Sequence, residues 1–131
     1  MRREYILIVL FLVSIIFLTG CNKQKALEDT VIDYFSYLNN ENWELAEDIA
    51  DPSCIEHFKK IIQLRPEGAR LKFVFNSLYD INSLIASAMA KVNYSIYIYL
   101  GNLEIDKINQ NAIANFIKVS LFNKWKIHYI I

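Results

Sequence analysis

Glycine, proline and cysteine are scarce in this sequence, which holds three, two and two of them among 131 residues. The isolated glycines form no glycine-rich phosphate loop. The two histidines stand apart from any cysteine cluster, so no metal-binding motif is present. Basic and acidic side chains balance at 14 each, without the positive surplus typical of nucleic-acid-binding proteins. The sequence therefore predicts no metal, no cofactor and no nucleic-acid partner.

The N-terminus carries a short apolar run, residues 6–18, which Ser14 alone interrupts and which follows Arg2 and Arg3. As a helix it would be about 20 Å long, shorter than the roughly 20 apolar residues that a membrane span requires, and typical of a signal-peptide core. It closes on Leu18-Thr19-Gly20-Cys21. This tetrapeptide resembles the lipobox of bacterial lipoproteins, in which the signal peptide is cut before an acylated cysteine.

The lipobox resemblance implies a division of the chain into three parts. Residues 1–20 would be a removable signal peptide, and residues 21–25 a short tether that begins at Cys21, the lipidated residue with fatty acyl chains such as palmitate. Residues 26–131 would form one domain of ordinary size. The domain would sit on the extracytoplasmic side of the cell membrane, within the cell envelope, with the lipid bilayer as its first partner. The alternative is an uncleaved signal anchor with an incidental cysteine.

Cys54 would then be the one free cysteine, so an internal disulfide is excluded. Its place in the first turn of an expected helix would allow a lowered thiol pKa, but no thiol-enzyme motif surrounds it, and a small buried residue is the preferred interpretation. Charge is unevenly spread, because residues 26–56 hold nine acidic and no basic residues. This pattern indicates a solvated acidic helical face or, alternatively, a polarised surface that steers a partner.

Three helices are predicted in the first half of the domain. Residues 26–38 carry an apolar stripe at helical spacing, made of Leu27, Val31, Tyr34, Phe35 and Leu38. A second helix is expected over residues 42–50, with Asn42 as its N-cap. A third starts at Pro52 after Asp51 and ends before the Arg-Pro-Glu-Gly of residues 65–68.

The apolar period changes to two after Gly68, which predicts strands. Strands are expected over residues 71–76 (extending towards 80), 92–100 (starting as early as 84), 112–122 and 125–131, whereas residues 103–111 are expected to form a polar loop. We expect shared faces for Ile113, Ile117 and Val119, and for Trp125, Ile127, Tyr129 and Ile131. Short turns favour antiparallel pairing. The fold class is therefore α+β, with three N-terminal helices packed on a strongly curved antiparallel sheet of three to four strands.

Two short motifs carry a resemblance to a known family. Asn40-Glu41-Asn42-Trp43-Glu44-Leu45-Ala46 lies between the first two predicted helices, and Trp125-Lys126-Ile127 lies in the last strand. With the order of elements over residues 26–131, they resemble nuclear-transport-factor-2-like domains of small bacterial lipoproteins. The resemblance implies a cone-shaped α+β domain with a cavity at its open end. Candidate residues lining that cavity are Tyr34, Trp43, Tyr94, Trp125 and Tyr129.

Tyr97 and Tyr99 stand side by side on the polar face of the most regular strand, and the spacing places Phe116 on the same face. This pattern indicates either cross-strand packing or an interface with a partner. The family resemblance adds that such domains commonly form dimers through this sheet face. Tyr97, Tyr99 and Phe116 are therefore candidate interface residues.

Function follows from these expectations only in outline. The preferred hypothesis is a membrane-anchored extracytoplasmic lipoprotein that acts as a non-catalytic module binding a small ligand or a protein. The alternative is a small, cofactor-free isomerase or dehydratase, which would need a carboxylate or imidazole in the cavity. His57, His128, Asp80 and Asp106 are expected at borders, faces or loops in solvent, so no catalytic residue is assigned. A third hypothesis, an immunity or inhibitor lipoprotein, requires a large exposed aromatic patch.

Overall fold

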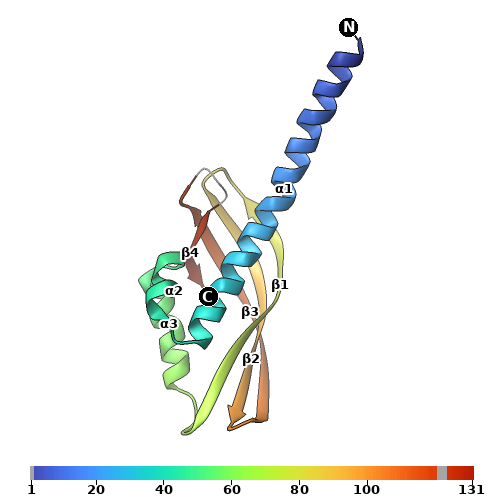
Figure 1. Ribbon diagram of the computed structural model, residues 1–131. Helices are drawn as coiled ribbons and strands as arrows, with labels where there is room; N and C mark the ends of the chain where they lie inside the picture. Colours follow the sequence, from blue (N-terminus) through green and yellow to red (C-terminus); the bar gives the residue numbers. More distant parts are fainter. Residues whose placement is uncertain (1, 121–123) are drawn as a thin grey trace.

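Over residues 2–120 and 124–131, which the structure describes, the computed structural model holds three helices followed by four strands (Figure 1). The side chains of residues 2 and 13–22 also lie outside that description. The strands form one antiparallel sheet in the order β1-β2-β3-β4, so the α+β class is confirmed. The elements are α1 (Arg2–Asn39), α2 (Trp43–Ile49), α3 (Pro52–Gln63), β1 (Ala69–Ser83), β2 (Ser87–Leu100), β3 (Leu103–Lys118) and β4 (Trp125–Ile130).

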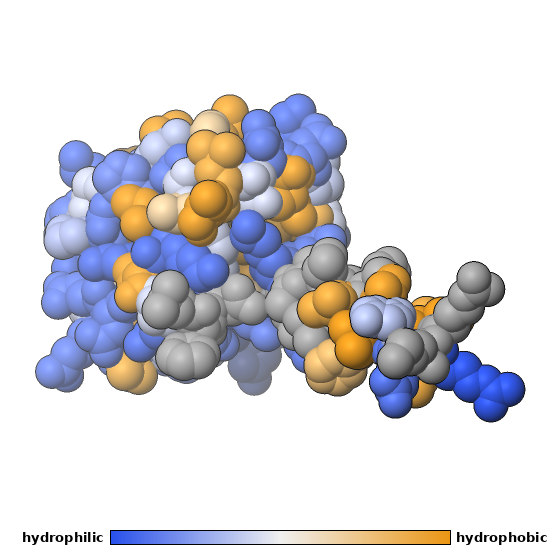
Figure 2. All heavy atoms as spheres, turned by 90° about the horizontal axis from the view of Figure 1, so that it is seen from above, coloured by the Kyte–Doolittle hydropathy of each residue, from blue (hydrophilic) through white to orange (hydrophobic). Residues whose placement is uncertain are grey.

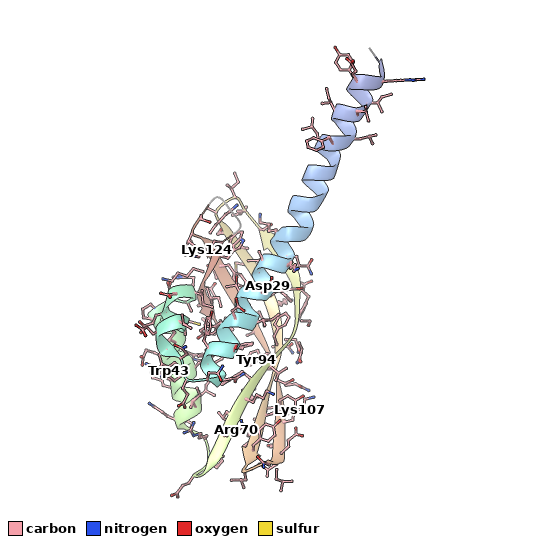
Figure 3. The ribbon with its side chains drawn as sticks, in the orientation of Figure 1. Asp29, Trp43, Arg70, Tyr94, Lys107 and Lys124 are labelled. Carbon is pink, nitrogen blue, oxygen red and sulfur yellow. The ribbon has the colours of Figure 1, made fainter. Side chains whose placement is uncertain are left out.

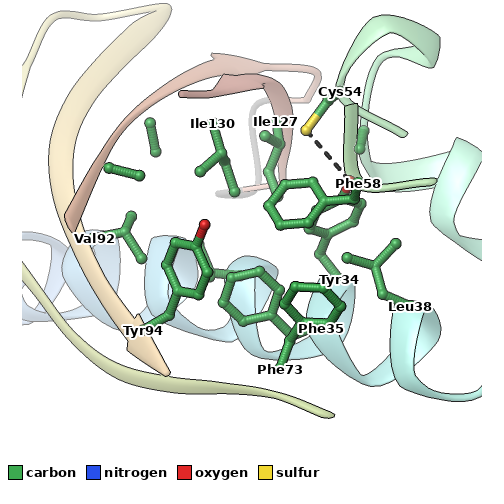
Figure 4. Close-up of a cluster of buried hydrophobic side chains, with 14 of the residues drawn as sticks. Tyr34, Phe35, Leu38, Cys54, Phe58, Phe73, Val92, Tyr94, Ile127 and Ile130 are labelled. Carbon is green, nitrogen blue, oxygen red and sulfur yellow. Dashed lines mark hydrogen bonds between the residues drawn. The ribbon is translucent and has the colours of Figure 1, made fainter. Parts of the chain in front are cut away.

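The hydrophobic core lies between the three helices and one face of the sheet. The stripe predicted on the first helix is buried in it, and its aromatic rings meet those of the sheet (Figure 4). The ring centroids of Phe35 and Tyr94 are 5.2 Å apart, and those of Phe58 and Phe73 are 5.4 Å apart. Helices therefore cover one face of the sheet, and the opposite face is the one free to carry a surface site.

The starts of α2 and α3 match the residues that the sequence indicates, through a side-chain cap in α2 and a proline in α3. The Asn42 side chain accepts a hydrogen bond from the Leu45 amide at 3.3 Å, so Asn42 is the N-cap that the sequence predicts. Pro52 occupies the first turn of α3, as expected. Asp51 holds the N-cap position of α3, but its side chain makes no capping hydrogen bond and turns to β4 instead.

The prediction of a polar loop over residues 103–111 is wrong, because β3 already begins at Leu103. These residues pair in register with β2, for example Lys107 with Tyr97 and Asn109 with Ser95. Every residue from 101 to 111 is exposed, so the strand forms through backbone pairing and needs no apolar alternation. Gly101, at φ +62°, makes the tight β2–β3 turn possible.

Backbone register corrects two predicted faces, those of Phe116 and Tyr129. Ile113 and Ile117 do share a face, as predicted, and it is the exposed open face of β3, whereas Phe116 is fully buried on the core face. In β4, a register shift between Asn115 and Phe116 of the partner strand breaks the alternation. Ile130 is consequently buried beside Trp125 and Ile127, in the place expected for Tyr129.

β4 is much shorter than β3 and covers only its end. The β3–β4 ladder runs from residue 114 to residue 118 of β3, and Ile113 exchanges two further backbone hydrogen bonds with Ile131. Within the described part of the chain, residues 103–112 therefore extend beyond β4 with one backbone edge open. The third strand was predicted to end at residue 122, whereas β3 ends at Lys118. Residues 121–122 lie outside the described residues.

α1 is one continuous helix of 38 residues, about 57 Å long. The predicted helix over residues 26–38 is its C-terminal part, and residues 21–25, the predicted tether, are helical as well. Cys21 lies in α1, although its side chain belongs to those not described. The first turns project away from the sheet (Figure 1). Among the described residues, no helix has the length and apolar content needed to cross a membrane.

Candidate binding surface on the open sheet face

The open face of the sheet carries two stacked tyrosines at its far end, away from the point where α1 leaves the domain. The rings of Tyr97 and Tyr99 are 6.4 Å apart and inclined by 25°. The Arg70 guanidinium lies 5.0 Å from the Tyr99 ring, and the Lys107 ammonium lies 5.2 Å from the Tyr97 ring. Both cations project at the same end of the sheet (Figure 3). We call these four residues the tyrosine patch.

Strand pairing explains why residues far apart in sequence meet in the tyrosine patch. Tyr97 pairs with Lys72 on one side and Lys107 on the other, and Arg70 pairs with Tyr99. A cation over an aromatic face is attracted by the ring quadrupole. Glu104, opposite Tyr99, is the one acidic residue paired with either tyrosine, and Asp106 pairs with Ile98 between them. The patch therefore presents two half-buried aromatic rings within a mainly positive surrounding.

A row of amide side chains continues from the tyrosine patch along the same face. The Asn76 amide donates to Ser95 Oγ at 2.8 Å, and Ser95 Oγ donates to Asn109 Oδ1 at 2.8 Å. The Asn93 amide donates to Asn111 Oδ1 at 2.8 Å. Ser95 is only 1% exposed beneath its neighbours. These bonds fix polar side chains in a flat, ordered row, which gives the open face a defined shape.

The structure does not bring together all three candidate interface residues. Tyr97 and Tyr99 share the open face, but Phe116 is fully buried between Ala88 and Ile127 on the core face. The expectation that Phe116 shares a face with the two tyrosines is therefore wrong. The pairing of β2 with β3 has no register shift between Ala88, the partner of Phe116, and Tyr97. Because side chains alternate between the two faces along a strand, Ala88 and Phe116 lie on the face opposite to Tyr97.

The residues predicted to line a cavity are distributed over three environments. Tyr34, Tyr94 and Trp125 are buried in the core, at 0%, 6% and 2% exposure. Tyr129 is half-buried and pairs with Asn115, which is not on the core face. Trp43 does line a surface cleft, of about 600 Å³, beside the C-terminal end of α3.

The cleft beside Trp43 was not predicted from the sequence, because a chain reversal at residues 65–68 closes it. The Lys59 ammonium lies 5.0 Å from the Trp43 ring, and an Arg65–Glu41 ion pair of 3.7 Å borders the cleft. The cleft has the volume of many small-molecule sites. Both ion-pair side chains are exposed, however, so the pair adds little stability or rigidity.

The titratable side chains do not combine into a nucleophilic site. Cys54 is 3% exposed, and its thiol donates a hydrogen bond to Tyr34. Burial raises the pKa of the Cys54 thiol and also the pKa values of Tyr34 and Tyr94. A thiol nucleophile needs the opposite shift. Cys54 therefore packs as a small buried residue, as the preferred interpretation of the sequence had it.

His128 is exposed, as predicted, and its Nδ1 contacts the Asp51 carboxylate in a close pair. Lys126 Nζ lies 3.6 Å from the other oxygen of Asp51. Next to this cluster the Asp51 amide donates to the Ile127 carbonyl at 2.9 Å. The cluster therefore joins the start of α3 to the edge of β4, which is a structural role.

No protein-family model matches the chain, and a search of curated proteins finds no match either. Among the described residues, no group of three or more histidine, cysteine or carboxylate side chains is placed to hold a metal ion. The site must therefore be interpreted from its own residues.

Proposed function

We propose that this protein is an extracytoplasmic lipoprotein, anchored in the cell membrane through acylated Cys21, that binds another protein through the open face of its sheet. The observation that carries the proposal is the tyrosine patch, because two stacked tyrosines with adjacent cations remain on the one sheet face without a helix. Tyrosine and arginine are enriched where proteins bind each other. The lipobox supports the anchor, and the order of helices and strands is compatible with a nuclear-transport-factor-2-like cone.

The charge of the patch favours a partner with an acidic surface. Arg70, Lys72 and Lys107 surround the tyrosines, and Glu104 is the one acidic residue paired with them in the sheet register. A symmetric dimer would bring two such positive patches together, and like charges across an interface are unfavourable. A different protein with clustered carboxylates therefore fits this face better than a second copy of the chain.

Two other hypotheses have less support from the residues. The cleft beside Trp43 favours a small ligand by its volume, but it is an open surface feature bordered by exposed charges. An isomerase or dehydratase would need a buried carboxylate or imidazole. Within residues 23–120 and 124–131, every Asp and His is exposed or only half-buried.

Photo-crosslinking in intact cells tests the proposal. A photoreactive amino acid replaces Tyr97 in one variant and Trp43 in another, and the adducts are identified by mass after membrane extraction. We expect a protein adduct at position 97 that high salt suppresses, because screening weakens a contact between exposed charges. The Trp43 site is the control for the cleft. An adduct of two identical chains at position 97, or a ligand adduct at position 43 alone, would contradict the proposal.

A further inference from the structure

The two ends of the sheet differ in a way that the binding function does not explain. At the far end, the turn between β2 and β3 consists of Gly101-Asn102, which are ordinary turn residues, and the exposed leucines beside it, Leu100 and Leu103, belong to the paired strands. At the other end, where α1 leaves the domain, the β1–β2 turn instead carries Leu84 and Ile85. Their exposed fractions are 69% and 92%. Large apolar side chains at a turn apex contribute nothing to the fold, so they indicate a contact outside the domain.

This apolar turn is held in a fixed position relative to α1 and β3. The Leu84 amide donates to the Ser87 carbonyl at 2.8 Å, which closes the turn. The Lys118 amide donates to the Ala86 carbonyl at 2.9 Å, and Lys23 Nζ donates to the Leu84 carbonyl at 3.3 Å. The turn is therefore built against the same segment of α1 that follows Cys21.

A set of lysines surrounds the apolar turn. Lys23 and Lys118 lie 5.6 and 5.8 Å from the ring of Trp125, which keeps both ammonium groups at this end. Lys25 and Lys124 are exposed as well, and Figure 3 places Lys124 at this end of the sheet. Among the acidic groups toward this end, Asp80 is engaged by Lys91 at 3.1 Å, Glu28 accepts from Gln24, and Asp29 is exposed on α1. Seen from above, hydrophobic and hydrophilic groups adjoin on this end (Figure 2).

We propose that this end of the domain, formed by Lys23, Leu84, Ile85, Val119 and Lys124, is a second membrane-binding surface. Leu84, Ile85 and Val119 enter the interface between headgroups and acyl chains, and the lysines contact anionic phospholipid headgroups. The inference rests on the proposed anchor, because Cys21 precedes Lys23 by two residues, about 3 Å of helix rise.

The second contact would fix the orientation of the domain. An acylated residue alone holds a domain to a bilayer without setting its angle, whereas an apolar turn beside it adds a second point of attachment. The sheet would then stand away from the membrane. Tyr97 follows Ser87 by ten residue steps along β2, so the tyrosine patch would lie about 33 Å from the bilayer surface.

Fluorescence quenching in vesicles tests this surface. The lipidated full chain is labelled with an environment-sensitive fluorophore at Leu84→Cys or, as the matched control, at Leu103→Cys. Both leucines are 69% exposed, and they lie at opposite ends of the sheet. Cys54, at 3% exposure, does not compete for the label. Each protein is placed in vesicles of phosphatidylcholine, with or without phosphatidylglycerol, that contain lipids with nitroxide groups on their acyl chains.

We expect several-fold stronger quenching at position 84 than at position 103, and stronger quenching at position 84 in the anionic vesicles. Equal quenching at the two positions would overturn the membrane contact, and equal quenching in both lipid mixtures would overturn the role of the lysines. The anchor is tested separately by the intact mass of the same protein, which shows whether Cys21 is acylated. If residues 1–20 are retained, Cys21 keeps a free thiol that would also take the label, so the comparison is then made with Cys21→Ser in both variants and only position 84 or 103 carries the fluorophore.

Discussion

The buried thiol of Cys54 donates a hydrogen bond to the hydroxyl oxygen of Tyr34, with 3.3 Å between sulfur and oxygen. The bond joins α3 to α1 inside the core (Figure 4). Burial raises the pKa of both groups, and for Cys54 this outweighs the lowering effect of its hydrogen-bonding contact with Tyr34. Folding therefore keeps protons on two groups that the unfolded chain would release in alkaline solution.

We expect the free energy of unfolding to decrease above about pH 9. The unfolded Cys54 thiol ionises near its ordinary pKa of 9.0, while the folded thiol stays protonated. The unfolded state then binds fewer protons, so stability falls by about 1.4 kcal/mol per pH unit until the folded pKa is reached. Urea unfolding of the detergent-solubilised chain across this range measures the slope. In Cys54→Ala the decline should begin only near pH 10, where the tyrosines ionise. An unchanged onset would show that another group is responsible.

The side chain of Asn39 forms hydrogen bonds with the outer backbone edge of β1, as a neighbouring strand would. Its amide donates to the Phe73 carbonyl and its carbonyl accepts from the Phe73 amide, both at 2.8 Å. We expect Asn39→Ala to lower the free energy of unfolding by about 1–3 kcal/mol, because two backbone groups lose their partner. Asn40→Ala is the control, since Asn40 makes one exposed bond to the Ser36 carbonyl, and its effect should stay within about 0.5 kcal/mol. Equal effects of the two substitutions would contradict the edge role.

The ring of Trp125 stabilises the core by packing, whereas the burial of its indole N–H is unfavourable. The side chain is 2% exposed, and its Nε1 has no hydrogen-bond partner among the described residues. An unpartnered buried donor costs about 1–3 kcal/mol, so Trp125→Phe should change stability by less than about 1 kcal/mol. Trp125→Ala should cost about 3–5 kcal/mol through the lost packing. Thermal unfolding of both variants provides the comparison, and a large loss in the phenylalanine variant would mean that Nε1 does have a partner.

Ser95 connects the amide row across three strands. Its hydroxyl accepts from Asn76 on β1 and donates to Asn109 on β3. Ser95→Ala should cost about 1 kcal/mol, because two side-chain hydrogen bonds to the buried Ser95 hydroxyl are lost, while Asn76 and Asn109 are themselves exposed. Ser77→Ala, at an exposed serine of β1, should have an effect within about 0.5 kcal/mol. Denaturant unfolding distinguishes the two variants, and a neutral Ser95→Ala would show that water replaces the hydroxyl.

Local patterns predicted the elements that bury an apolar face. The stripe from Leu27 to Leu38, the Asn42 cap and the alternation in β2 each reflect side-chain burial or capping, which neighbouring residues encode. The far half of β3 could not be predicted in this way. Its residues are all exposed, so only pairing with β2 makes them a strand. The position of Tyr129 depends on a bulge, for which the sequence has no local signal.

The candidate site was predicted in part for the same reason. Tyr97 and Tyr99 are neighbours on one strand, so alternation alone places them together. Arg70 and Lys107 reach them only through the register of two other strands. The predicted face of Phe116 is wrong because the sequence pattern does not indicate whether the odd-numbered or the even-numbered residues of β3 are buried. The cleft beside Trp43 depends on a chain reversal, which no periodicity describes.

The part of β3 that extends beyond β4 has a consequence for how copies of the protein meet. An uncovered strand edge is a template for pairing with the edge of another molecule. Copies that stand on one membrane in the proposed orientation all direct β3 towards the lipid, so rotation about the membrane normal can only bring their edges together in parallel. Parallel pairing is less stable per residue than antiparallel pairing. Anchoring would thus restrain sheet-to-sheet aggregation that the detached domain remains free to undergo.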